Sequence, residues 1–250
     1  MAEQGILKAG VIALVTGAGS GIGAAVAEQL AARGARVICA GRRVERLNAL
    51  VQRLGESAFA LQLDVADPHS TATLLERLPA ELRPIDILVN NAGHDVGGRR
   101  RFDLGDLEEW ASIIETNVTG MIRVTHAIAP GMVARGRGHI VNLGSVAGLR
   151  VYRSGSIYNA SKFAVRAFTE GLRMDYADTD IRVTEILPGL TRTGFAAARL
   201  HGDRHRGEDY YARFPGTIAA ADVARAVIFA LEQPPSVTIA QLVVVPTREA

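Results

Sequence analysis

The chain has 250 residues, of which 48% are hydrophobic and 22% are charged, and its formal net charge at pH 7 is +2. This length and composition are typical of one globular domain with a large core, and the nearly balanced charge gives no indication of nucleic-acid binding. Cys39 is the one cysteine, which excludes an internal disulfide and a cysteine-based zinc site.

The amino-terminal segment MAEQGILKAG has neither the charged region nor the apolar region of a secretion signal. No apolar run in the sequence approaches the roughly 18 residues that a membrane span needs. We therefore expect a cytoplasmic protein that does not bind a membrane.

Short β-branched runs alternate along the chain with longer segments of helical pattern. Strands are expected at 11–16, 36–40, 58–63, 85–90, 138–145, 181–188 and 241–245, and helices at 21–33, 43–54, 68–78, 107–115, 118–134, 158–176 and 221–232. Alternation of this kind is typical of βαβ units, and strands that are apolar on both faces indicate a parallel sheet covered by helices on each side. The pattern predicts a single α/β domain, residues 1–250, with a doubly wound sheet of seven parallel strands.

The interval 188–217 has no regular pattern. An irregular segment of this length in a compact domain is more often a binding segment than a simple connection. We expect a substrate lid at about 190–216.

The first expected strand ends in TGAGSGIG, residues 16–23, and a helix follows at once. Glycines in this position let the backbone turn tightly and approach a pyrophosphate, and the start of the helix offers it unpaired amides. The residues expected to bind a dinucleotide here are Gly17, Gly19, Ser20, Gly21, Ile22 and Gly23.

The second expected strand ends at Gly41, and Arg42 and Arg43 follow it. Proteins that bind NAD usually carry an acidic residue at this strand end, where it takes the ribose hydroxyls. Two guanidinium groups suit a 2'-phosphate instead, because each can bind it through two hydrogen bonds. The predicted cofactor is therefore NADP.

Tyr158 and Lys162 are four residues apart in the segment GSIYNASKFAVRAF, so a helix places them on one face. A phenol titrates at about pH 10, and a positive charge beside it favours the ionised form. The pair could therefore be a tuned proton donor and acceptor, although such pairs also arise by chance.

Five motifs in order decide between these interpretations: TGxxxGIG (16–23), NNAG (90–93), TNVTG around Asn117, Ser145, and YNASK (158–162). On these motifs the sequence resembles the short-chain dehydrogenase/reductase family, from about residue 10 to 245. Within the family, NLGSVAG, RVTEILPGL and LVVVPT resemble NADP-dependent 3-hydroxy acid dehydrogenases of the serine and allo-threonine type. The chain departs from these in NNAGHDVG, in AGLRVYRSGS and in its short tail.

The resemblance implies a Rossmann-type sheet in the order 3-2-1-4-5-6-7 and a homotetramer built on the helices that begin near 118 and 158 and on the last strand. It implies that Tyr158 is the catalytic acid and base, that Lys162 and the positive charge of the oxidised nicotinamide together lower the pKa of Tyr158, and that Lys162 holds the nicotinamide ribose. It also implies that Ser145 donates a hydrogen bond to the substrate oxygen. Asn117 is similar to the family residue that anchors a proton path.

Other family positions that bind the cofactor carry over in the same way. The resemblance places Asp64 and Val65 against the adenine, and Asn91, Ala92 and Gly93 beneath the adenosine ribose. After the sixth strand it assigns the nicotinamide carboxamide and the phosphates to Pro188, Gly189, Leu190, Thr191 and Thr193.

Substrate contacts are expected from segments that flank Ser145 and Tyr158, from His94 and Asp95 after NNAG, and from the lid. Several arginines near a carbonyl site suit an acidic substrate, such as a 3-hydroxy acid or a semialdehyde, because a guanidinium can bind a carboxylate bidentately. The candidates for this role are Arg150, Arg153 and Arg199. His201 and His205 are spaced like a metal-binding pair, but no third ligand stands at a recognisable spacing, so no metal is expected.

Two alternatives stay open. A reductase of 3-oxoacyl groups on a carrier protein or coenzyme A would use the same motifs, and a catalytically silent NADP-binding sensor would keep the fold without the chemistry. A serine hydrolase is excluded, because its nucleophile motif Gly-x-Ser-x-Gly needs glycine where this chain has Leu143.

Overall fold

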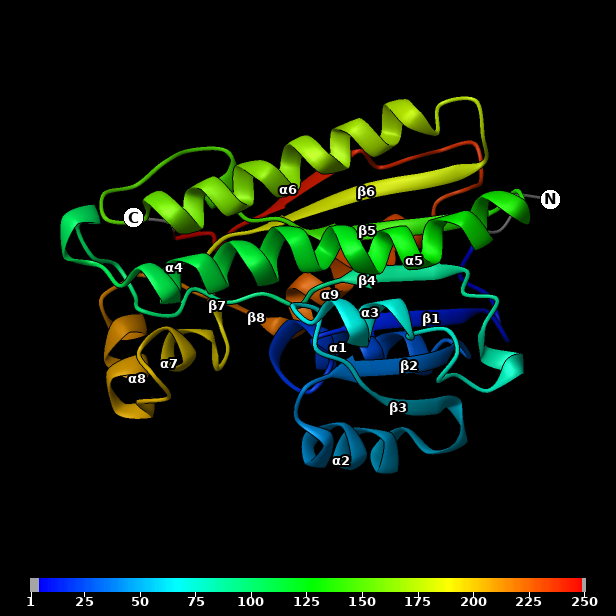
Figure 1. Ribbon diagram of the computed structural model, residues 1–250, viewed down its shortest axis with the longest axis horizontal. Coiled ribbons are helices and arrows are strands. Elements are labelled where there is room, and N and C mark those ends of the chain that lie inside the picture. Colours follow the sequence, from blue (N-terminus) through cyan, green and yellow to red (C-terminus); the bar gives the residue numbers. More distant parts are fainter. Residues whose placement is uncertain (1–4, 249–250) are drawn as a thin grey trace.

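The computed structural model describes residues 5–248 of the chain (Figure 1). Its strands are β1 (Ile12–Thr16), β2 (Arg36–Gly41), β3 (Ala58–Gln62), β4 (Ile87–Asn90), β5 (Gly138–Leu143), β6 (Ile181–Pro188), β7 (Thr191–Arg192), β8 (Ile218–Ala219) and β9 (Gln241–Val244). Its α-helices are α1 (Gly21–Ala31), α2 (Val44–Leu54), α3 (Pro68–Ala72), α4 (Leu107–Ile114), α5 (Met121–Ala134), α6 (Ser156–Asp175), α7 (Phe195–Arg199), α8 (Arg204–Ala212) and α9 (Ala220–Leu231).

Seven strands form one parallel sheet in the order β3-β2-β1-β4-β5-β6-β9. The predicted sheet and its order are therefore confirmed, with β9 as the seventh strand. The short strands β7 and β8 pair separately, with Thr191 opposite Ile218.

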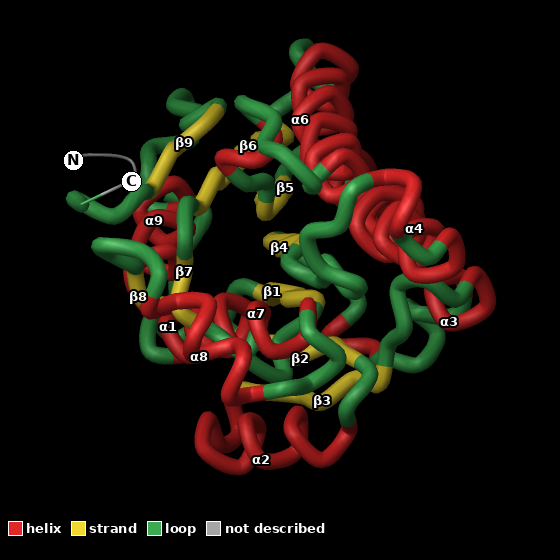
Figure 2. Tube along the Cα trace, turned by 90° about the vertical axis from the view of Figure 1, so that its left-hand side faces the viewer, coloured by secondary structure: helices red, strands yellow, loops and turns green. Residues whose placement is uncertain are grey.

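Helices cover both faces of the sheet. Figure 2 shows α1 and α9 on one side of it and α3, α4 and α6 on the other. Two apolar clusters fill these layers: Val26 and Leu30 of α1 pack with Val227 of α9 in one, and Val124 of α5 packs with Leu172 of α6 in the other. None of the helices within residues 5–248 is long and apolar enough to cross a membrane.

The structure differs from the expected elements in three places. The helix expected at 68–78 ends at Ala72, where the hydroxyls of Thr71 and Thr73 bond to carbonyls of the preceding turn. The helices expected at 107–115 and 118–134 are joined through a π-helical turn, Glu115–Gly120. The interval 188–217, expected to be irregular, contains α7 and α8, which lack a long apolar stripe.

Candidate active site

A cavity of about 700 Å³ lies at the carboxyl ends of the strands. Loops that follow β1, β2, β4, β5 and β6 contribute to its lining, and α7 and α8 lie beyond these strand ends, at the left of Figure 1. Doubly wound sheets bind ligands in this position, and the volume is in the usual range for small-molecule sites.

Most residues expected at the site line this cavity. They are Gly17, Gly19, Ser20, Gly21, Ile22, Arg42, Arg43, Asp64, Val65, Asn91, Ala92, Gly93, Ser145, Arg150, Tyr158, Lys162, Pro188, Gly189, Leu190, Thr191, Thr193 and Arg199. Gly23, Asn117 and Arg153 are not part of the lining. Gly23 packs behind the loop, where a Cβ atom would collide with Asn91 and with the carbonyl of Gly17.

The glycine-rich loop after β1 is fixed against the loop after β4. The Asn91 side chain donates a hydrogen bond of 2.9 Å to the Thr16 carbonyl, and the Asn91 backbone amide donates one of 3.0 Å to the Thr16 hydroxyl. Gly17 has φ +66°, and a Cβ atom on it would lie 2.8 Å from the Asn91 amide nitrogen. The loop can approach this closely because residue 17 has no side chain.

Helix α1 begins directly at this loop. Its N-cap residue, Ser20, makes no side-chain capping bond, so the first backbone amides of the helix have no cap. Uncapped amides together with the positive end of the helix dipole suit a phosphate group. The loop therefore fits the pyrophosphate of a dinucleotide.

Three arginines stand together beside this loop. Arg43 donates a hydrogen bond of 2.9 Å to the Ser20 hydroxyl, and Arg42 and Arg46 line the same part of the cavity. Burial and the charges of Arg46 and Arg42 lower the pKa of Arg43. Three guanidinium groups this close suit a dianionic phosphate.

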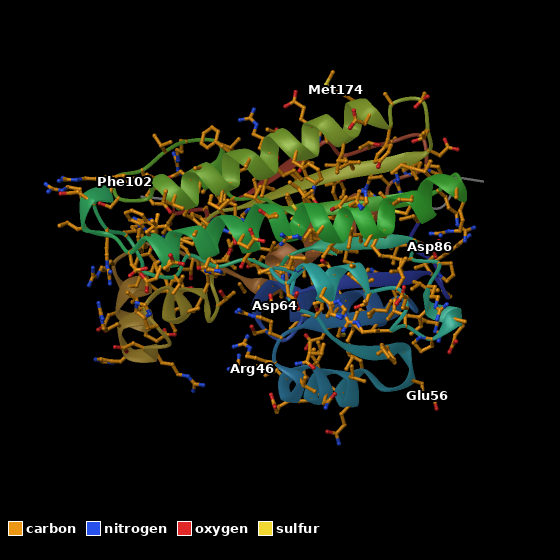
Figure 3. All side chains as sticks on the ribbon, in the orientation of Figure 1. Arg46, Glu56, Asp64, Asp86, Phe102 and Met174 are labelled. Carbon is orange, nitrogen blue, oxygen red and sulfur yellow. The ribbon has the colours of Figure 1, made fainter. Side chains whose placement is uncertain are left out.

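Arg46 was not among the residues expected from the sequence. It lies on the first turn of α2, where Figure 3 labels it, and it lines the same cavity as Asp64. Its position three residues after Arg43 is the pattern that could have identified it, since helical residues at this spacing are neighbours.

The structure brings Ser145, Tyr158 and Lys162 together at the other end of the cavity. Ser145 follows β5 by two residues, and its hydroxyl accepts a hydrogen bond of 3.1 Å from the Ala147 amide. Tyr158 and Lys162 lie on the first turns of α6, with the Lys162 ammonium nitrogen 5.8 Å from the centre of the Tyr158 ring. The same nitrogen donates a hydrogen bond of 2.8 Å to the Leu143 carbonyl.

Burial sets the protonation of these side chains. It raises the pKa of Tyr158 well above its ordinary value, and a hydrogen bond with Ser145 opposes only part of this rise. Burial lowers the pKa of Lys162 to about 8, against the opposing charges of Glu185 and Asp95. The pKa of Tyr158 is expected to fall when both Lys162 and an oxidised nicotinamide are beside it. In the protein alone burial raises this pKa, because the loss of water outweighs nearby charges.

Asn117 lies behind these residues in the π-helical turn and is 2% exposed. Its side-chain nitrogen donates to the His94 carbonyl at 3.0 Å and to the Ser161 hydroxyl at 3.1 Å, and its oxygen accepts from the His94 amide at 2.9 Å. These bonds join the loop after β4 to the turn of α6 that carries Lys162. A π turn in a helix often marks a functional site.

Aromatic rings surround the space next to Tyr158. The Phe195 ring is 5.8 Å from the Tyr158 ring, and the Arg199 guanidinium lies 5.0 Å from the centre of the Tyr210 ring. The Arg99 guanidinium lies 4.2 Å from the centre of the Tyr152 ring. Arg99, Tyr152, Phe195 and Tyr210 line the cavity and were not named from the sequence. Phe195 and Tyr210 belong to the lid, and Tyr152 belongs to the departing segment AGLRVYRSGS.

The three arginines expected to bind an acidic substrate have different environments. Arg199 is buried, with its Nε atom 2.7 Å from Oδ2 of the equally buried Asp95. Arg150 is exposed and lines the cavity. Arg153 is exposed outside it, which corrects the expected substrate contact: the turn packs the neighbouring Tyr152 ring against Gly155 and points residue 153 to the surface.

The two lid histidines each face a single carboxylate. The His201 ring nitrogen is 3.2 Å from Glu109, and the His205 ring nitrogen is 3.8 Å from Asp209. Within residues 5–248, no group of three or more His, Cys, Asp or Glu side chains could hold a metal ion.

Comparisons with known proteins agree with this geometry. The family model for short chain dehydrogenases matches residues 11–203. The chain is 39% identical over 241 residues to an NADP-dependent 3-hydroxy acid dehydrogenase of Salmonella typhi, with 96% of each chain covered. It is also 39% identical over 242 residues to sulfoacetaldehyde reductase 2 of Chromohalobacter salexigens, covering 96% of this chain and 95% of the relative.

Among solved structures, the closed form of a serine dehydrogenase complexed with NADP+ superposes with a TM-score of 0.90. The two sequences are 40% identical, and 94% of each chain is covered. The predicted family is confirmed: the chain belongs to the short chain dehydrogenase family.

Proposed function

We propose that the protein is an NADP-dependent oxidoreductase that interconverts an alcohol and a carbonyl compound. The observation that carries this proposal is the arrangement of one cavity. A glycine-rich loop and three arginines lie at one end of it, and Ser145, Tyr158 and Lys162 lie at the other. The names of the relatives support both the cofactor and the class of reaction.

The residues present fit NADP along the whole cavity. The uncapped start of α1 holds the pyrophosphate, and Arg42, Arg43 and Arg46 hold the 2'-phosphate. Asp64 and Val65 contact the adenine, and the loops 91–93 and 188–193 contact the riboses, the phosphates and the carboxamide. When bound, NADP supplies the hydride acceptor or, in its reduced form, the donor, and its oxidised ring adds a positive charge.

Tyr158 supplies the proton. Its raised pKa keeps the phenol neutral near pH 7, so the hydroxyl can protonate the oxygen of a carbonyl as that oxygen gains negative charge. Ser145 donates a second hydrogen bond to the same oxygen and fixes its position. In the reverse direction Tyr158 removes the alcohol proton.

Lys162 and Asn117 support this proton transfer. The buried Lys162 is held by the Leu143 carbonyl close to Tyr158, and its pKa of about 8 lets it gain or lose a proton near neutral pH. Asn117 holds the turn of α6 through Ser161 and so fixes the position of Lys162. A proton path behind the lysine is the role that the family resemblance gives to Asn117.

Segment 190–216 acts as the lid of the cavity in this proposal. Tyr211 of α8 is 3% exposed, and its hydroxyl donates to the Thr191 and Thr193 carbonyls at 3.1 and 3.0 Å and accepts from the Thr193 amide at 3.2 Å. These bonds hold α8, in the later part of the lid, against residues 191–193, which the proposal places beside the nicotinamide carboxamide.

Exposed apolar side chains support the proposed homotetramer. They lie on the elements that the resemblance assigns to subunit contacts: Ile122 and Val133 on α5, Phe163 and Met174 on α6, and Val243 on β9. Exposed apolar patches often mark protein interfaces. The same proposal places the protein in the cytoplasm, where NADPH is available to it.

The test is to mix the purified protein with NADPH and a panel of carbonyl compounds and to follow the absorbance of the reduced nicotinamide. The panel contains semialdehydes, 3-oxo acids, their esters and 3-oxoacyl thioesters, so the last class tests the alternative function. Tyr158→Phe is the control, because it removes the proton donor and leaves the ring. NADPH binding without turnover of any compound would contradict the enzyme and support a silent sensor.

A further inference from the structure

The buried ion pair of Asp95 and Arg199 lies at the substrate end of the cavity. The Arg199 side chain is 8% exposed and that of Asp95 is 5% exposed. Arg199 belongs to the lining of the cavity, whereas Asp95 contacts the guanidinium from behind the lining. Asp95 lies in the segment NNAGHDVG, which follows β4.

Arg199 is placed where a substrate would meet it. Its guanidinium lies 5.5 Å from the centre of the Phe195 ring, and that ring is 5.8 Å from the ring of Tyr158. The centre of the Tyr210 ring lies 5.0 Å from it. A cation in contact with aromatic rings next to the proton donor is well placed to bind an anionic group of the substrate.

Asp95 neutralises the positive charge of this guanidinium by forming an ion pair with it. Nε of Arg199 lies 2.7 Å from the carboxylate as an ion pair, and neither Nε nor Nη1, both buried, has a hydrogen-bond partner of good geometry among residues 5–248. A carboxylate or sulfonate entering the cavity would therefore meet a nearly neutral pair and would compete with Asp95 for the arginine. Buried ion pairs are costly to separate, so Asp95 is not displaced easily.

The electrostatic effect of the ion pair on Tyr158 agrees with this geometry. The Asp95 charge raises the pKa of Tyr158 more than the Arg199 charge lowers it. At Tyr158, the pair of Asp95 and Arg199 therefore stabilises a negative charge less than Arg199 alone would. Arg99 and Arg150 also line the cavity, and the Arg99 guanidinium lies against the Tyr152 ring.

We propose that Asp95 is a specificity-determining residue that withholds Arg199 from anionic substrates. It thereby shifts the preference of the enzyme from carbonyl compounds that carry a carboxylate or sulfonate toward uncharged ones that contact the aromatic rings. The inference rests on the proposed oxidoreductase function. Under this inference, an acidic substrate of the natural protein would bind without the free charge of Arg199.

The test compares an acid with its ester in the natural protein and in Asp95→Asn. Asparagine keeps the size of the side chain and an oxygen for Arg199 but removes the charge. We expect the ratio of kcat/KM for 3-oxobutanoate to that for methyl 3-oxobutanoate to rise about 10-fold to 100-fold, because a charge-assisted hydrogen bond is typically worth that much. Adding Arg199→Met to Asp95→Asn should abolish the gain.

A matched control is Asp86→Asn. Asp86 is another buried aspartate paired with an arginine, Arg137, at 3.2 Å, and it precedes β4, whereas Asp95 follows that strand. Figure 3 shows Asp86 at the end of the molecule away from α7 and α8. This substitution should leave the ratio unchanged. If Asp95→Asn does not fold, Asp95→Ser serves the same comparison.

A binding measurement separates this inference from the proposed function. Calorimetry with the NADPH-loaded protein, in which an alcohol cannot react, gives the affinities for 3-hydroxybutanoate and for its methyl ester. Stronger binding of the acid in Asp95→Asn, with the ester unchanged, supports the inference even if no carbonyl compound is turned over. A ratio within twofold of the natural protein, in both binding and turnover, would overturn it and leave the oxidoreductase proposal intact.

Discussion

The ammonium group of Lys162 donates a hydrogen bond of 2.8 Å to the carbonyl oxygen of Leu143, and this bond joins the start of α6 to the end of β5. Ser145 lies two residues beyond Leu143, and Tyr158 lies one helical turn before Lys162. This one hydrogen bond therefore holds the Ser145 hydroxyl, which follows β5, close to the Tyr158 phenol, which lies on α6.

The first prediction concerns the stability of the protein without cofactor. Burial lowers the pKa of Lys162 from its ordinary value of 10.5 to about 8, so the unfolded chain binds more protons than the folded protein between these values. The free energy of unfolding should therefore rise with pH from about 8 to about 10, relative to Lys162→Met, by up to about 3 kcal/mol. Urea unfolding of both proteins at pH 7.5, 9 and 10 measures this. A relative stability that falls over this range would contradict the lowered pKa.

The second prediction concerns the pH dependence of turnover. Because the pKa of Tyr158 is raised, its proton is in place for carbonyl reduction through neutral pH, whereas alcohol oxidation needs the proton to leave. We expect kcat/KM for oxidation to rise between pH 7 and 9 while that for reduction changes little. Tyr158→Phe should lower both by roughly 100-fold to 10,000-fold. Tyr176→Phe, beyond the other end of α6, should leave both unchanged; equal pH profiles in the two directions would count against the assignment.

The third prediction concerns cofactor choice. Arg46 should contribute to NADPH binding together with Arg42 and Arg43, since all three line the cavity beside Ser20. Each single change to alanine should weaken NADPH binding about 10-fold or more and NADH binding much less, because NADH lacks the 2'-phosphate.

Fluorescence titration with both nucleotides measures these affinities. Arg53→Ala is the matched control, because Arg53 lies on the same helix but pairs with Glu28 at 2.5 Å and is not part of the cavity lining. Equal affinity of the natural protein for NADH and NADPH would refute the role of the arginines.

The fourth prediction concerns the lid. Tyr211→Phe removes the hydroxyl that bonds to Thr191 and Thr193 and leaves those backbone groups without it. We expect a loss of about 1–3 kcal/mol in stability and a higher KM for NADPH, since the loop that contacts the carboxamide is no longer fixed. Thermal unfolding and initial rates measure the two effects. An unchanged KM with lowered stability would limit Tyr211 to a structural role.

The sequence by itself determined the features that depend on neighbouring residues. The seven strands, the glycine-rich turn before α1, and the spacing of Tyr158 and Lys162 on one helix are local patterns that can be read directly in the sequence. The order of the strands depends on pairing between distant segments, and it was expected from the resemblance to the family. Arg42 and Arg43, directly after β2, are also a local pattern, because they are neighbours in the sequence. The helices α7 and α8 escaped prediction because short, mostly polar helices have no apolar period to reveal them.

The tertiary structure alone decided which charges meet. Asp95 and Arg199 come from a strand-end loop and from the lid, so no spacing in the chain could show that they form a pair. Tyr152 faces the cavity and Arg153 does not, because one turn packs the Tyr152 ring against Gly155. The pKa of Tyr158 rises although a lysine lies nearby, because burial removes the water that would stabilise a phenolate, and burial is a property of the whole fold.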